Sequence, residues 1–577
     1  MAGRVKVMIV GGYGTFGGRI VELLKDEPRL ALIVAGRSLA TADAFCKPRS
    51  SGKAELIAAV FDRDGDLRAQ IATLAPAIVV DASGPFQAYG AEPYRLIAAC
   101  IAQGVNYLDL ADGSHFVAGV GTFDAAARVA GLFVLSGASS FPVLTAAVVR
   151  RLASGMARVE TIRGGIAPSP HAGVGQNVIR AIASYAGQPV AMRKDGRAAT
   201  GHPFTEQMRF TIARPGRLPL PSTMFSLVDV PDLRALAELW PQARTIWMGA
   251  GPVPAVLHRA LISLAWLVRW KWLPNLTLLA PLMIWATNRL RWGKHRGGMF
   301  VAVEGADASG ALCKRSWHLL AEGDDGPLIP SMAVEALVRR TLDGQPPAPG
   351  ARAAVRDLEL ADYERLFNGR TIYAGVRDES QNDGAPLYSR LLGTAWNELP
   401  VEVRAIHEVA GTASGRASVE RGDGLLAQLA AALIGFPKAA SNTPVKVRFE
   451  AANGIETWTR DFGGEAFSSQ QFAGSGRSDQ LLCERFGALT FGMALVVDGG
   501  RLSLVVRRWC VLGVPLPMWL CPRSNAHEDV EDGKFHFHVE IGHPLTGLIV
   551  RYRGWLVPDP PPASTTRTAR PRAAVPS

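Results

Sequence analysis

The chain has 577 residues, of which 48% are hydrophobic and 20% are charged, with 60 glycines and 38 prolines. A chain of this length is too long to fold around one hydrophobic core, so we expect about three domains. The apolar fraction excludes a largely disordered protein. The net charge of +11 suits phosphate-bearing ligands or an anionic membrane surface and argues against a nucleic-acid-binding protein. Six scattered cysteines without a C-x-x-C pair are typical of a reducing compartment, and we recognise no signal peptide, so we expect a cytoplasmic protein.

Strands and helices alternate over residues 1–150. Short β-branched apolar runs predict strands, and amphipathic stretches between them predict helices. This alternation predicts βαβ crossovers and a Rossmann-type, doubly wound parallel sheet with helices on both faces. The predicted strands are 4–10, 30–35, 55–61, 77–82 and 105–110, and the predicted helices are 18–26, 38–46, 66–74 and 91–103.

The rest of the chain predicts two further domains, so the overall fold class is α/β. Residues 151–376 mix strands and helices as a second α+β domain that returns to the first. Residues 386–556 predict a C-terminal, mainly antiparallel, β-rich α+β domain, a half-barrel around a helix, and residues 557–577 predict a disordered tail. The predicted strands here are 299–304, 314–321, 444–450, 456–459, 489–497, 501–507 and 535–541, with helices at 331–342 and 424–434.

A glycine motif follows the first predicted strand, in the segment Gly12-Tyr13-Gly14-Thr15-Phe16-Gly17. The motif is informative because it lies between a buried strand and a helix at the start of a βαβ unit. Gly12 permits the tight turn, Gly14 lets the backbone approach a pyrophosphate, and Gly17 allows close contact between helix and sheet. Free N–H groups at the helix start would then bind phosphates, so all six residues are candidate cofactor contacts.

The end of the second predicted strand distinguishes between the two nicotinamide cofactors. An NAD site places a carboxylate there, whereas this sequence has Arg37 and Ser38. Arg37 can pair with a 2′-phosphate, and Ser38 can cap the next helix as well as touch that phosphate, so we predict NADP. Asp62, after the third strand, is a candidate contact for the adenine amino group, and a turn-forming role is the alternative.

A further ordered set of motifs spans residues 82–109. In this set the chain resembles the saccharopine dehydrogenase-like family, whose NADP-binding domain carries a similar pattern; the resemblance is good over residues 4–150 and weaker through residue 375. The motifs are Ala82-Ser83-Gly84-Pro85-Phe86, Tyr89-Gly90, Ala99-Cys100 and Gly104-Val105-Asn106-Tyr107-Leu108-Asp109.

The resemblance implies an NADP-dependent oxidoreductase. In that family the loop after the fourth strand lies near the nicotinamide end of the cofactor, which places Ser83, Gly84, Pro85 and Phe86 there. A saccharopine-forming enzyme must hold an amino-dicarboxylate with clustered basic side chains, and we find no such set. We therefore predict a small-molecule substrate with a hydrophobic or lipid-linked carbonyl, imine or enoyl group.

Candidate catalytic residues follow the fifth strand, at the sheet edge where open α/β folds bind ligands. His115 could exchange a proton during hydride transfer, with Asp109 or Asp112 tuning it. The alternative is that these aspartates cap a helix or brace a loop. Tyr89 is a rival proton donor, and packing against Pro85 is its alternative role.

The last domain resembles a bacterial domain of unknown function that follows such dehydrogenase-like modules. His536 and His538 share one face of a strand, with His543 nearby, but no third ligand has a metal-site spacing, so we assign no metal. The matching motifs are Leu391-Leu392-Gly393, His407, Gly415-Arg416-Ala417, Trp458-Thr459-Arg460-Asp461-Phe462, Cys483-Glu484-Arg485-Phe486-Gly487 and His536-Phe537-His538.

Residues 255–289 are the most apolar part of the chain. Prolines interrupt the charge-free run between Lys271 and Arg289, which falls short of the roughly 20 apolar residues that a spanning helix needs. Tryptophans interleaved with basic residues predict a surface that contacts a membrane over residues 255–292, and a buried helical hairpin is the alternative. These residues are Trp266, Arg269, Trp270, Lys271, Trp272, Trp285, Arg289, Arg291, Trp292 and Lys294.

Two other functions stay open. One is a catalytically silent NADP-binding scaffold, motivated by the weak catalytic set. The other is a lipid-binding protein that acts through residues 386–556. A homo-oligomer is compatible with all three functions.

Overall fold

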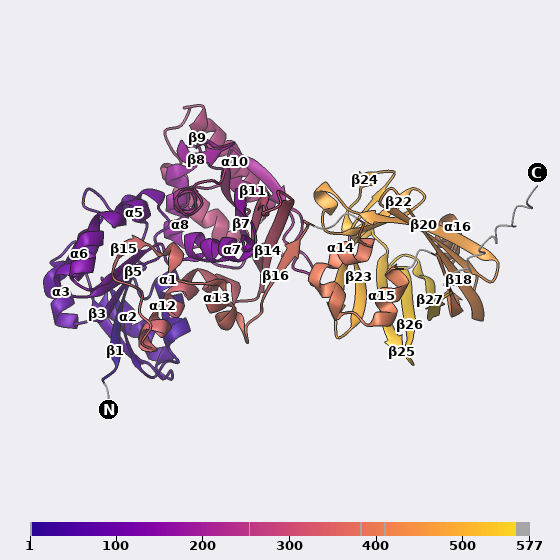
Figure 1. Cartoon of the computed structure of the whole chain (residues 1–577), viewed down its shortest axis with the longest axis horizontal. Coiled ribbons are helices and arrows are strands. Elements are labelled where there is room, and N and C mark those ends of the chain that lie inside the picture. Colours follow the sequence, from indigo (N-terminus) through magenta and orange to yellow (C-terminus); the bar gives the residue numbers. More distant parts are fainter. Residues whose placement is uncertain (1–2, 253, 381–383, 409–410, 561–577) are drawn as a thin grey trace, which may run out of the picture. The chain divides into compact units, whose positions relative to one another are not determined.

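The computed structural model describes residues 3–252, 254–380, 384–408 and 411–560. The chain divides into two compact units, coloured along the sequence in Figure 1. The first unit is Met1–Arg214 with Pro219–Asn382, and the second is Pro215–Leu218 with Asp383–Ser577. The short segment Pro215–Leu218 therefore belongs to the second unit, although its neighbours in sequence belong to the first.

The first sheet of the first unit consists of β1 (Val5–Val10), β2 (Leu30–Gly36), β3 (Glu55–Val60), β4 (Ile78–Asp81), β5 (Asn106–Asp109), β6 (Phe133–Ser136) and β15 (Gly350–Ala353). The strand order is β15-β6-β5-β4-β1-β2-β3, and all neighbours run parallel. The order reverses beside β1, as in a doubly wound nucleotide-binding sheet. The prediction of a Rossmann-type domain is confirmed.

Helices connect these strands: α1 (Thr15–Leu24), α2 (Leu39–Cys46), α3 (Leu67–Leu74), α4 (Arg95–Ala102), α5 (Ser114–Gly119), α6 (Asp124–Val129) and α7 (Thr145–Leu152). Alternate residues of β1 pack into different cores, Val7 and Ile9 into one and Met8 and Val10 into the other. Both faces of the sheet are therefore covered, which explains why its strands are apolar throughout.

The second sheet contains β7 (Arg158–Ala167), β10 (Gln207–Phe210), β11 (Thr223–Leu227), β12 (Thr245–Ala250), β13 (Arg296–Ala306), β14 (Leu312–Glu322) and β16 (Ile372–Asp378). The order is β10-β11-β12-β7-β13-β14-β16, with β12 and β7 parallel and the other neighbours antiparallel. A separate hairpin, β8 (Val190–Lys194) and β9 (Arg197–Gly201), lies outside this sheet. The helices are α8 (Gln176–Tyr185), α9 (Asp232–Leu239), α10 (Ala255–Arg269), α11 (Ala280–Arg289), α12 (Met332–Leu342) and α13 (Leu360–Phe367).

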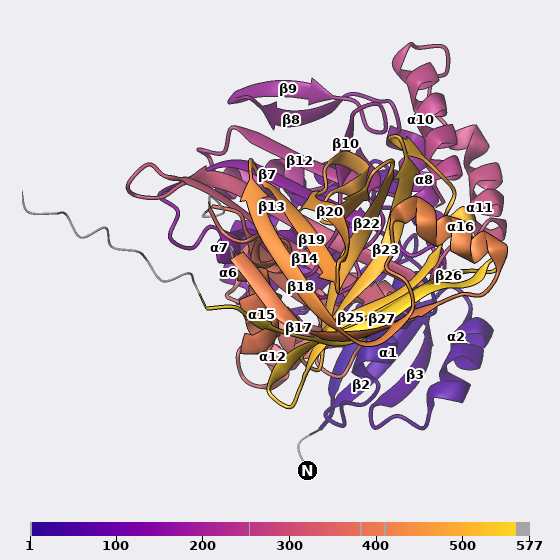
Figure 2. The same cartoon turned by 90° about the vertical axis from the view of Figure 1, so that its right-hand side faces the viewer.

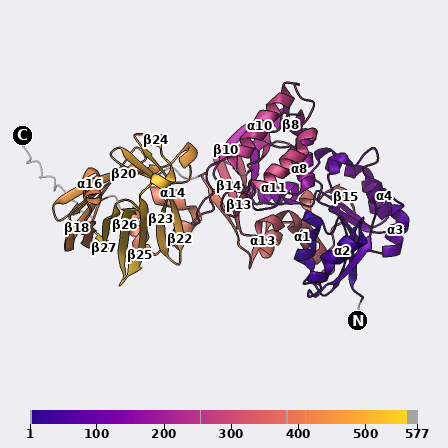
Figure 3. The ribbon, with the colours of Figure 1, turned by 180° about the vertical axis from the view of Figure 1, so that it is seen from behind.

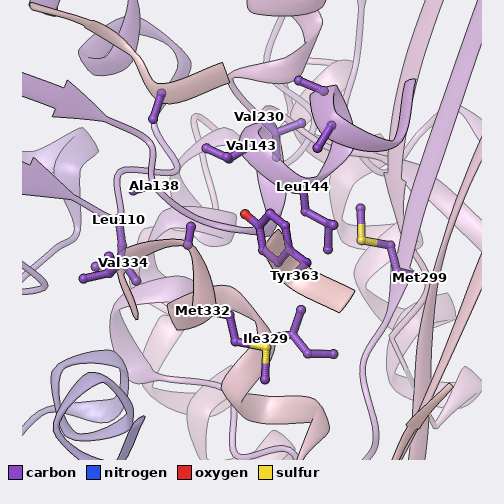
Figure 4. Close-up of a cluster of buried hydrophobic side chains, with 14 of the residues drawn as sticks. Leu110, Ala138, Val143, Leu144, Val230, Met299, Ile329, Met332, Val334 and Tyr363 are labelled. Atoms are coloured by element: carbon purple, nitrogen blue, oxygen red, sulfur yellow. The ribbon is translucent and has the colours of Figure 1, made fainter. Parts of the chain in front are cut away.

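A continuous hydrophobic core joins the two sheets of the first unit. Figure 4 shows Tyr363 of α13 at its centre, between Leu144 from the end of the first sheet's domain and Met332 of α12. Val230 and Met299 of the second sheet's domain belong to the same cluster. Because β15 pairs with β6 directly after α12, the chain returns to the first sheet through this core.

The apolar stretch of residues 255–289 forms a helical hairpin of α10 and α11. Its inner side is buried through Ala265, Val268 and Leu276, and α11 packs against α8 (Figure 3). Among the described helices, none combines the length and the apolar character that crossing a membrane requires. The outward side chains of the hairpin and its flanks are exposed: Trp270, Trp272, Leu278, Leu282, Trp285 and Trp292.

The second unit is built on β17 (Gly411–Arg421), β18 (Ala440–Ala452), β19 (Ile455–Phe462), β20 (Glu465–Ala473), β21 (Leu482–Phe486), β22 (Leu489–Asp498), β23 (Arg501–Val511), β24 (Val514–Pro515), β25 (Arg523–Glu531), β26 (Lys534–His543) and β27 (Gly547–Pro558). The order is β22-β21-β20-β19-β18-β17-β27-β26-β25-β23-β24, and β22 also pairs with β23. That extra pairing closes the sheet into an antiparallel barrel, so the predicted β-rich class is confirmed and the predicted half-barrel is wrong.

Three helices accompany the barrel: α14 (Leu387–Leu392), α15 (Val401–Glu408) and α16 (Leu425–Ile434). In Figure 2, α15 and α16 lie toward opposite ends of the strands. The last strand, β27, continues to Pro558 and so includes the first two residues of the predicted tail. Residues 561–577 of that tail lie outside the described residues.

Candidate functional site

The glycine turn connects β1 to α1, and each glycine in it has a steric reason. Gly11 has a φ of +76°, and a Cβ there would lie 2.9 Å from Ser83 Cα. A Cβ at Gly12 would lie 2.8 Å from the Ile9 carbonyl oxygen, and one at Gly17 only 2.2 Å from the Gly11 carbonyl oxygen. Sequence reasoning expected a turn at Gly11-Gly12 and assigned its tight bend to Gly12, whereas the positive φ lies at Gly11.

Gly14 is less crowded than the other glycines of the turn, and the space beside it shows whether a pyrophosphate could fit there. A Cβ at Gly14 would approach only the Gly11 carbonyl group, while the other side of the residue is open and exposed. Gly14 is also the N-cap of α1, and no side chain caps this helix start. Open backbone at an uncapped helix start fits a pyrophosphate group, with the N–H groups of Thr15 and Phe16 as donors.

A segment of the second domain covers this helix start. Arg19 of α1 donates hydrogen bonds to the carbonyl oxygens of Ala172 (2.7 Å) and Gly173 (3.2 Å). A Cβ at Gly175 would lie 3.3 Å from Thr15 Oγ1, so the start of α8 faces the start of α1. Residues of both domains of the first unit therefore meet beside the glycine turn.

Tyr13 and Ser38 form the corner at the end of β2. The Tyr13 ring lies over Gly36, where a Cβ would be 2.5 Å from the ring, and its hydroxyl accepts a hydrogen bond of 3.2 Å from Ser38 N. Ser38 Oγ accepts the Thr41 N–H at 3.3 Å, so Ser38 caps α2. Arg37 is exposed and has no hydrogen bond or ion pair with any described residue, which leaves its guanidinium available to a ligand.

Asp62 has the geometry of a turn-forming residue. Its Oδ1 accepts the Asp64 N–H at 3.1 Å, and its main chain exchanges hydrogen bonds with the Gln70 side chain. The carboxylate is exposed at the end of β3. The turn therefore exists, and the contact with adenine stays a prediction.

The loop after β4 is held by Asp81, which sequence reasoning missed. Its Oδ1 accepts hydrogen bonds from Ser83 N (3.0 Å) and Ser83 Oγ (2.6 Å), and its Oδ2 accepts the Tyr89 hydroxyl at 3.1 Å. The Arg63 guanidinium lies over the Tyr89 ring, 3.3 Å from the ring centroid. An acid at the end of an apolar strand was the available signal for this network.

The next residues of this loop are held from α8. Asn177 Nδ2 donates to the carbonyl oxygens of Ser83 (3.0 Å) and Gly84 (2.9 Å). Pro85 is half-buried, and the Phe86 ring is buried against Tyr89, with ring centroids 4.8 Å apart. Ser83, Gly84 and Pro85 therefore keep backbone near the glycine turn, whereas the Phe86 side chain packs into the domain.

Asp109 lies in the interior and braces two loops. Its Oδ1 accepts hydrogen bonds from Ala111 N (2.9 Å), Ser136 Oγ (2.9 Å) and Gly137 N (2.7 Å). Burial raises the pKa of the Asp109 carboxyl to about 7, although these hydrogen bonds oppose the shift. The bracing alternative considered for this residue matches the geometry, and its carboxylate does not bond to His115.

A cluster of polar groups gathers where α5 meets the start of α9. Ser114 Oγ donates a 2.5 Å hydrogen bond to Asp229 Oδ1, and burial raises the pKa of the Asp229 carboxyl, an effect that the Ser114 hydrogen bond and the His115 charge partly offset. Asp112 accepts from Gln87 Nε2 at 3.1 Å, and burial together with Asp229 raises its pKa.

This cluster brings His115 and Asp112 together with two residues that sequence reasoning missed. Tyr185 of α8 is one of them, and burial beside Asp112 and Asp229 raises the pKa of its hydroxyl well above its ordinary value. The His115 imidazole is exposed and neighbours Asp229 electrostatically. Asp229 lies in an apolar segment before a helix-starting proline, which was its only signal in the sequence. The exposed imidazole of His115 can exchange a proton with a bound molecule.

The residues that the sequence analysis weighed for a metal are elsewhere, on the barrel. The His538 ring stacks on His527 at 4.8 Å, and His536 Nδ1 lies 3.7 Å from a Glu531 carboxylate oxygen. Within the described part of the chain, no group of three or more metal-ligating side chains comes together.

Comparison with protein families identifies both ends of the chain. Residues 7–131 match the family model of the saccharopine dehydrogenase NADP binding domain. The N-terminal domain is similar to the dinucleotide-binding domain of that family. Residues 399–556 match the model of a domain of unknown function, DUF4166, and correspond to the barrel. The resemblance inferred from the motifs is confirmed at both ends, and residues 132–398 lie between the two matched segments.

Three solved structures illustrate the likeness of this chain to known proteins. Saccharopine dehydrogenase (L-Glu forming) from Saccharomyces cerevisiae is 14% identical, with a TM-score of 0.47 over 65% of this chain and 99% of that one. GenD2 from gentamicin A biosynthesis, in complex with NAD, is 15% identical, with a TM-score of 0.32 over 65% and 97%. A meso-dapdh variant from Clostridium tetani is 14% identical, with a TM-score of 0.31 over 63% and 99%. No protein with a curated description matches the chain.

Proposed function

We propose that the first unit is an NADP-dependent oxidoreductase that transfers hydride to or from a hydrophobic carbonyl, imine or enoyl group. The observation that carries the proposal is the group of residues after β1 and β2. It combines open backbone at Gly14, an uncapped α1 and a guanidinium, Arg37, with no partner among the described residues. These are the groups that a pyrophosphate and a 2′-phosphate require.

The preference for NADP over NAD rests on the residues directly after β2. The strand ends in Gly36, and the next side chains are Arg37 and Ser38, so no carboxylate stands there to accept the two hydroxyls of an adenosine ribose. Arg37 instead offers a charge-assisted, bidentate partner to a phosphate. The Tyr13 hydroxyl holds the Ser38 main chain in place beside it.

The chain itself would handle the proton. When bound, NADPH would supply the hydride, and the carbonyl oxygen, the imine nitrogen or the α-carbon of an enoyl group then needs a proton. We assign that proton exchange to His115, which is exposed at the start of α5, and we assign to Asp229 the stabilisation of the protonated imidazole. Ser114 positions Asp229 through their 2.5 Å hydrogen bond.

The apolar hairpin supports a lipid-like substrate and a peripheral membrane contact. No Asp or Glu lies between Glu238 and Glu304, while tryptophans and basic residues recur over residues 255–292. Exposed Trp272 and Trp285 together with this positive charge suit the interface of an anionic bilayer. Because α11 packs on α8, which carries Asn177 and Tyr185, a docked hairpin would lie next to the proposed site.

Titrations of the full chain with NADPH and NADH test the cofactor assignment. We expect NADPH to bind at least about ten-fold more tightly than NADH, and Arg37→Ala to remove that preference while Arg151→Ala, an exposed arginine on α7, retains it. No binding of NADPH at millimolar concentration would overturn the proposal. Tight binding without NADPH oxidation across apolar carbonyl, imine and enoyl compounds would instead favour the catalytically silent scaffold.

A further inference from the structure

The barrel of the second unit encloses a cavity of about 250 Å³. Every second residue of a barrel strand points inward, and most of the inward side chains are apolar. Arg460, Gln471, Glu484, His527 and Glu528 also line the cavity. The volume lies just below the roughly 300 Å³ at which pockets for drug-sized ligands begin, so the space suits one slender chain. Side chains on its wall include Val447, Phe491, Met493, Val506, Phe537 and Val539.

One end of the barrel is closed by α14 and α15. The rings of Tyr388 and His407 stack with their centroids 3.7 Å apart. The Tyr388 hydroxyl donates to Gln471 Oε1 at 3.0 Å near the end of β20, and His407 Nε2 lies 2.7 Å from Glu528 Oε2 near the end of β25. Both helices are thereby tied across the same end of the strands, and a ligand cannot enter there without breaking buried hydrogen bonds.

The other end carries the connections that follow β17, β23 and β26. Ala430 and Ile434 of α16 line the cavity at this end, so α16 lies beside its mouth. An unusual number of apolar side chains here face solvent, which suits the passage of an apolar ligand. They are Leu425, Leu429, Leu512, Val514, Trp519 and Leu545.

Each carboxylate on the cavity wall has a partner: Glu484 pairs with Arg460, and Glu528 lies 2.7 Å from His407 Nε2. Arg460 donates to Glu484 Oε1 at 3.1 Å and to Ser469 Oγ at 2.8 Å, and Ser469 and Gln471 also donate to Glu484 Oε1. The side chains of Arg460 and Glu484 are only 13% and 10% exposed. A carboxylate ligand would have to compete with Glu484 for Arg460 and would add an unbalanced buried charge. An uncharged oxygen can share a donor of Arg460 without that cost.

We propose that the barrel binds one slender neutral lipid, an alkyl or isoprenoid chain that ends in a hydroxyl or carbonyl group. The chain lies along the apolar wall, and the oxygen meets the Arg460–Glu484 pair. Entry is from the α16 end. This site is separate from the proposed dinucleotide site and requires no bound cofactor, so it stands independently of the proposed oxidoreductase activity.

Calorimetric titration of the full chain with 1-decanol and with decanoate tests the site, since the two probes differ in charge and share one chain length. We expect wild type to bind decanol at least ten-fold more tightly than decanoate. Glu484→Gln retains the oxygen that accepts from Ser469 and Gln471 but leaves Arg460 unbalanced, so we expect it to reverse the preference. Glu540→Gln, which removes a carboxylate paired with Arg551, is the matched control and should change neither affinity.

A cavity-filling variant tests the place of binding. Ala526 lines the cavity, and Ala526→Phe should abolish binding of decanol while circular dichroism shows a folded chain. Binding of neither probe to wild type, tighter binding of decanoate than of decanol, or undiminished binding to a folded Ala526→Phe variant would each overturn the proposal. Should Glu484→Gln fail to fold, the ratio of the two affinities in wild type and the result for Ala526→Phe still decide whether the proposal holds.

Gly14→Ala alters the proposed dinucleotide site and should leave decanol binding unchanged. Failure of the lipid proposal can therefore be told apart from failure of the proposed oxidoreductase function.

Discussion

The Tyr89 hydroxyl donates a 3.1 Å hydrogen bond to the buried carboxylate of Asp81, and this contact decides how Tyr89 can act. Burial and the negative charge of Asp81 raise the pKa of Tyr89 beyond its ordinary range. A phenol whose proton is held by a carboxylate and whose ionised form is disfavoured is a poor proton donor to a substrate. Tyr89 therefore belongs to the support of the loop after β4.

Replacement of Tyr89 by Phe tests this assignment. We expect a loss of about 1–2 kcal/mol in the free energy of unfolding, because Asp81 loses one of its hydrogen-bond donors inside the domain. NADPH affinity should change by less than about three-fold, and turnover of any substrate found should persist. Chemical denaturation and cofactor titration measure both. A variant that binds NADPH normally but has lost all turnover would instead make Tyr89 the proton donor.

Gly14→Ala separates cofactor binding from folding. The added methyl group would lie 3.0 Å from the Gly11 carbonyl oxygen and otherwise projects into open space, so we expect a small backbone shift and a modest fall in the melting temperature. We expect the affinity for NADPH to fall at least about ten-fold, because the methyl group occupies the approach of the pyrophosphate. The matched control is Gly121→Ala, where an added Cβ meets nothing within 4 Å and NADPH binding should be unaffected.

The sequence predicted those features that depend on interactions between residues close to one another in the chain. The turn at Gly12 and Gly14 and the helix cap at Ser38 each depend on a few consecutive residues, and each was expected in its place. The Asp229 contact with Ser114 joins residues 115 positions apart, and no local pattern specifies such a pairing. Sequence reasoning named Asp109 or Asp112 as the partner of His115: the fold turns Asp109 inward, whereas Asp112 lies with Asp229 in the His115 cluster.

The closed barrel escaped prediction for a related reason. Strands β20 and β21 place Gln471 and Glu484 on the inner face, where a strand pattern normally has apolar residues, so the alternation was obscured. Ring closure depends on the pairing of β22 with both β21 and β23, which is a property of the whole sheet. An interior built around a polar pair is thus hard to recognise before the strands are assembled.

Asp109 makes stability depend on pH in a direction that can be worked out. Its pKa rises from 3.8 to about 7 on folding, so between these values the folded chain binds more protons than the unfolded chain. Stability therefore falls as pH rises, by up to roughly 1.4 kcal/mol per pH unit from this group. Asp109→Asn keeps an oxygen acceptor for Ala111, Ser136 and Gly137 but cannot ionise, so we expect a flatter profile between pH 4 and 7.

Urea unfolding at several pH values measures this slope. Asp26→Asn, which removes an exposed carboxylate without a described partner, is the control and should leave the profile of wild type unchanged. An Asp109→Asn profile as steep as that of wild type would mean that Asp109 is ionised in the folded protein across this range. In that case the hydrogen bonds that Asp109 accepts from the two loops would be charge-assisted.

The exposed tryptophans of the α10–α11 hairpin should govern binding to anionic vesicles. Trp272 and Trp285 are 75% and 60% exposed, and the surrounding segment carries positive charge without a carboxylate. We expect wild type to sediment with phosphatidylglycerol vesicles at low salt and to be released as screening increases. Trp272→Ser with Trp285→Ser should reduce the partition at least about ten-fold, because the interface loses two aromatic anchors. Val129→Ser on α6, at a position 91% exposed, should have no effect, and equal sedimentation of the double variant and wild type would show that the hairpin does not contact the membrane.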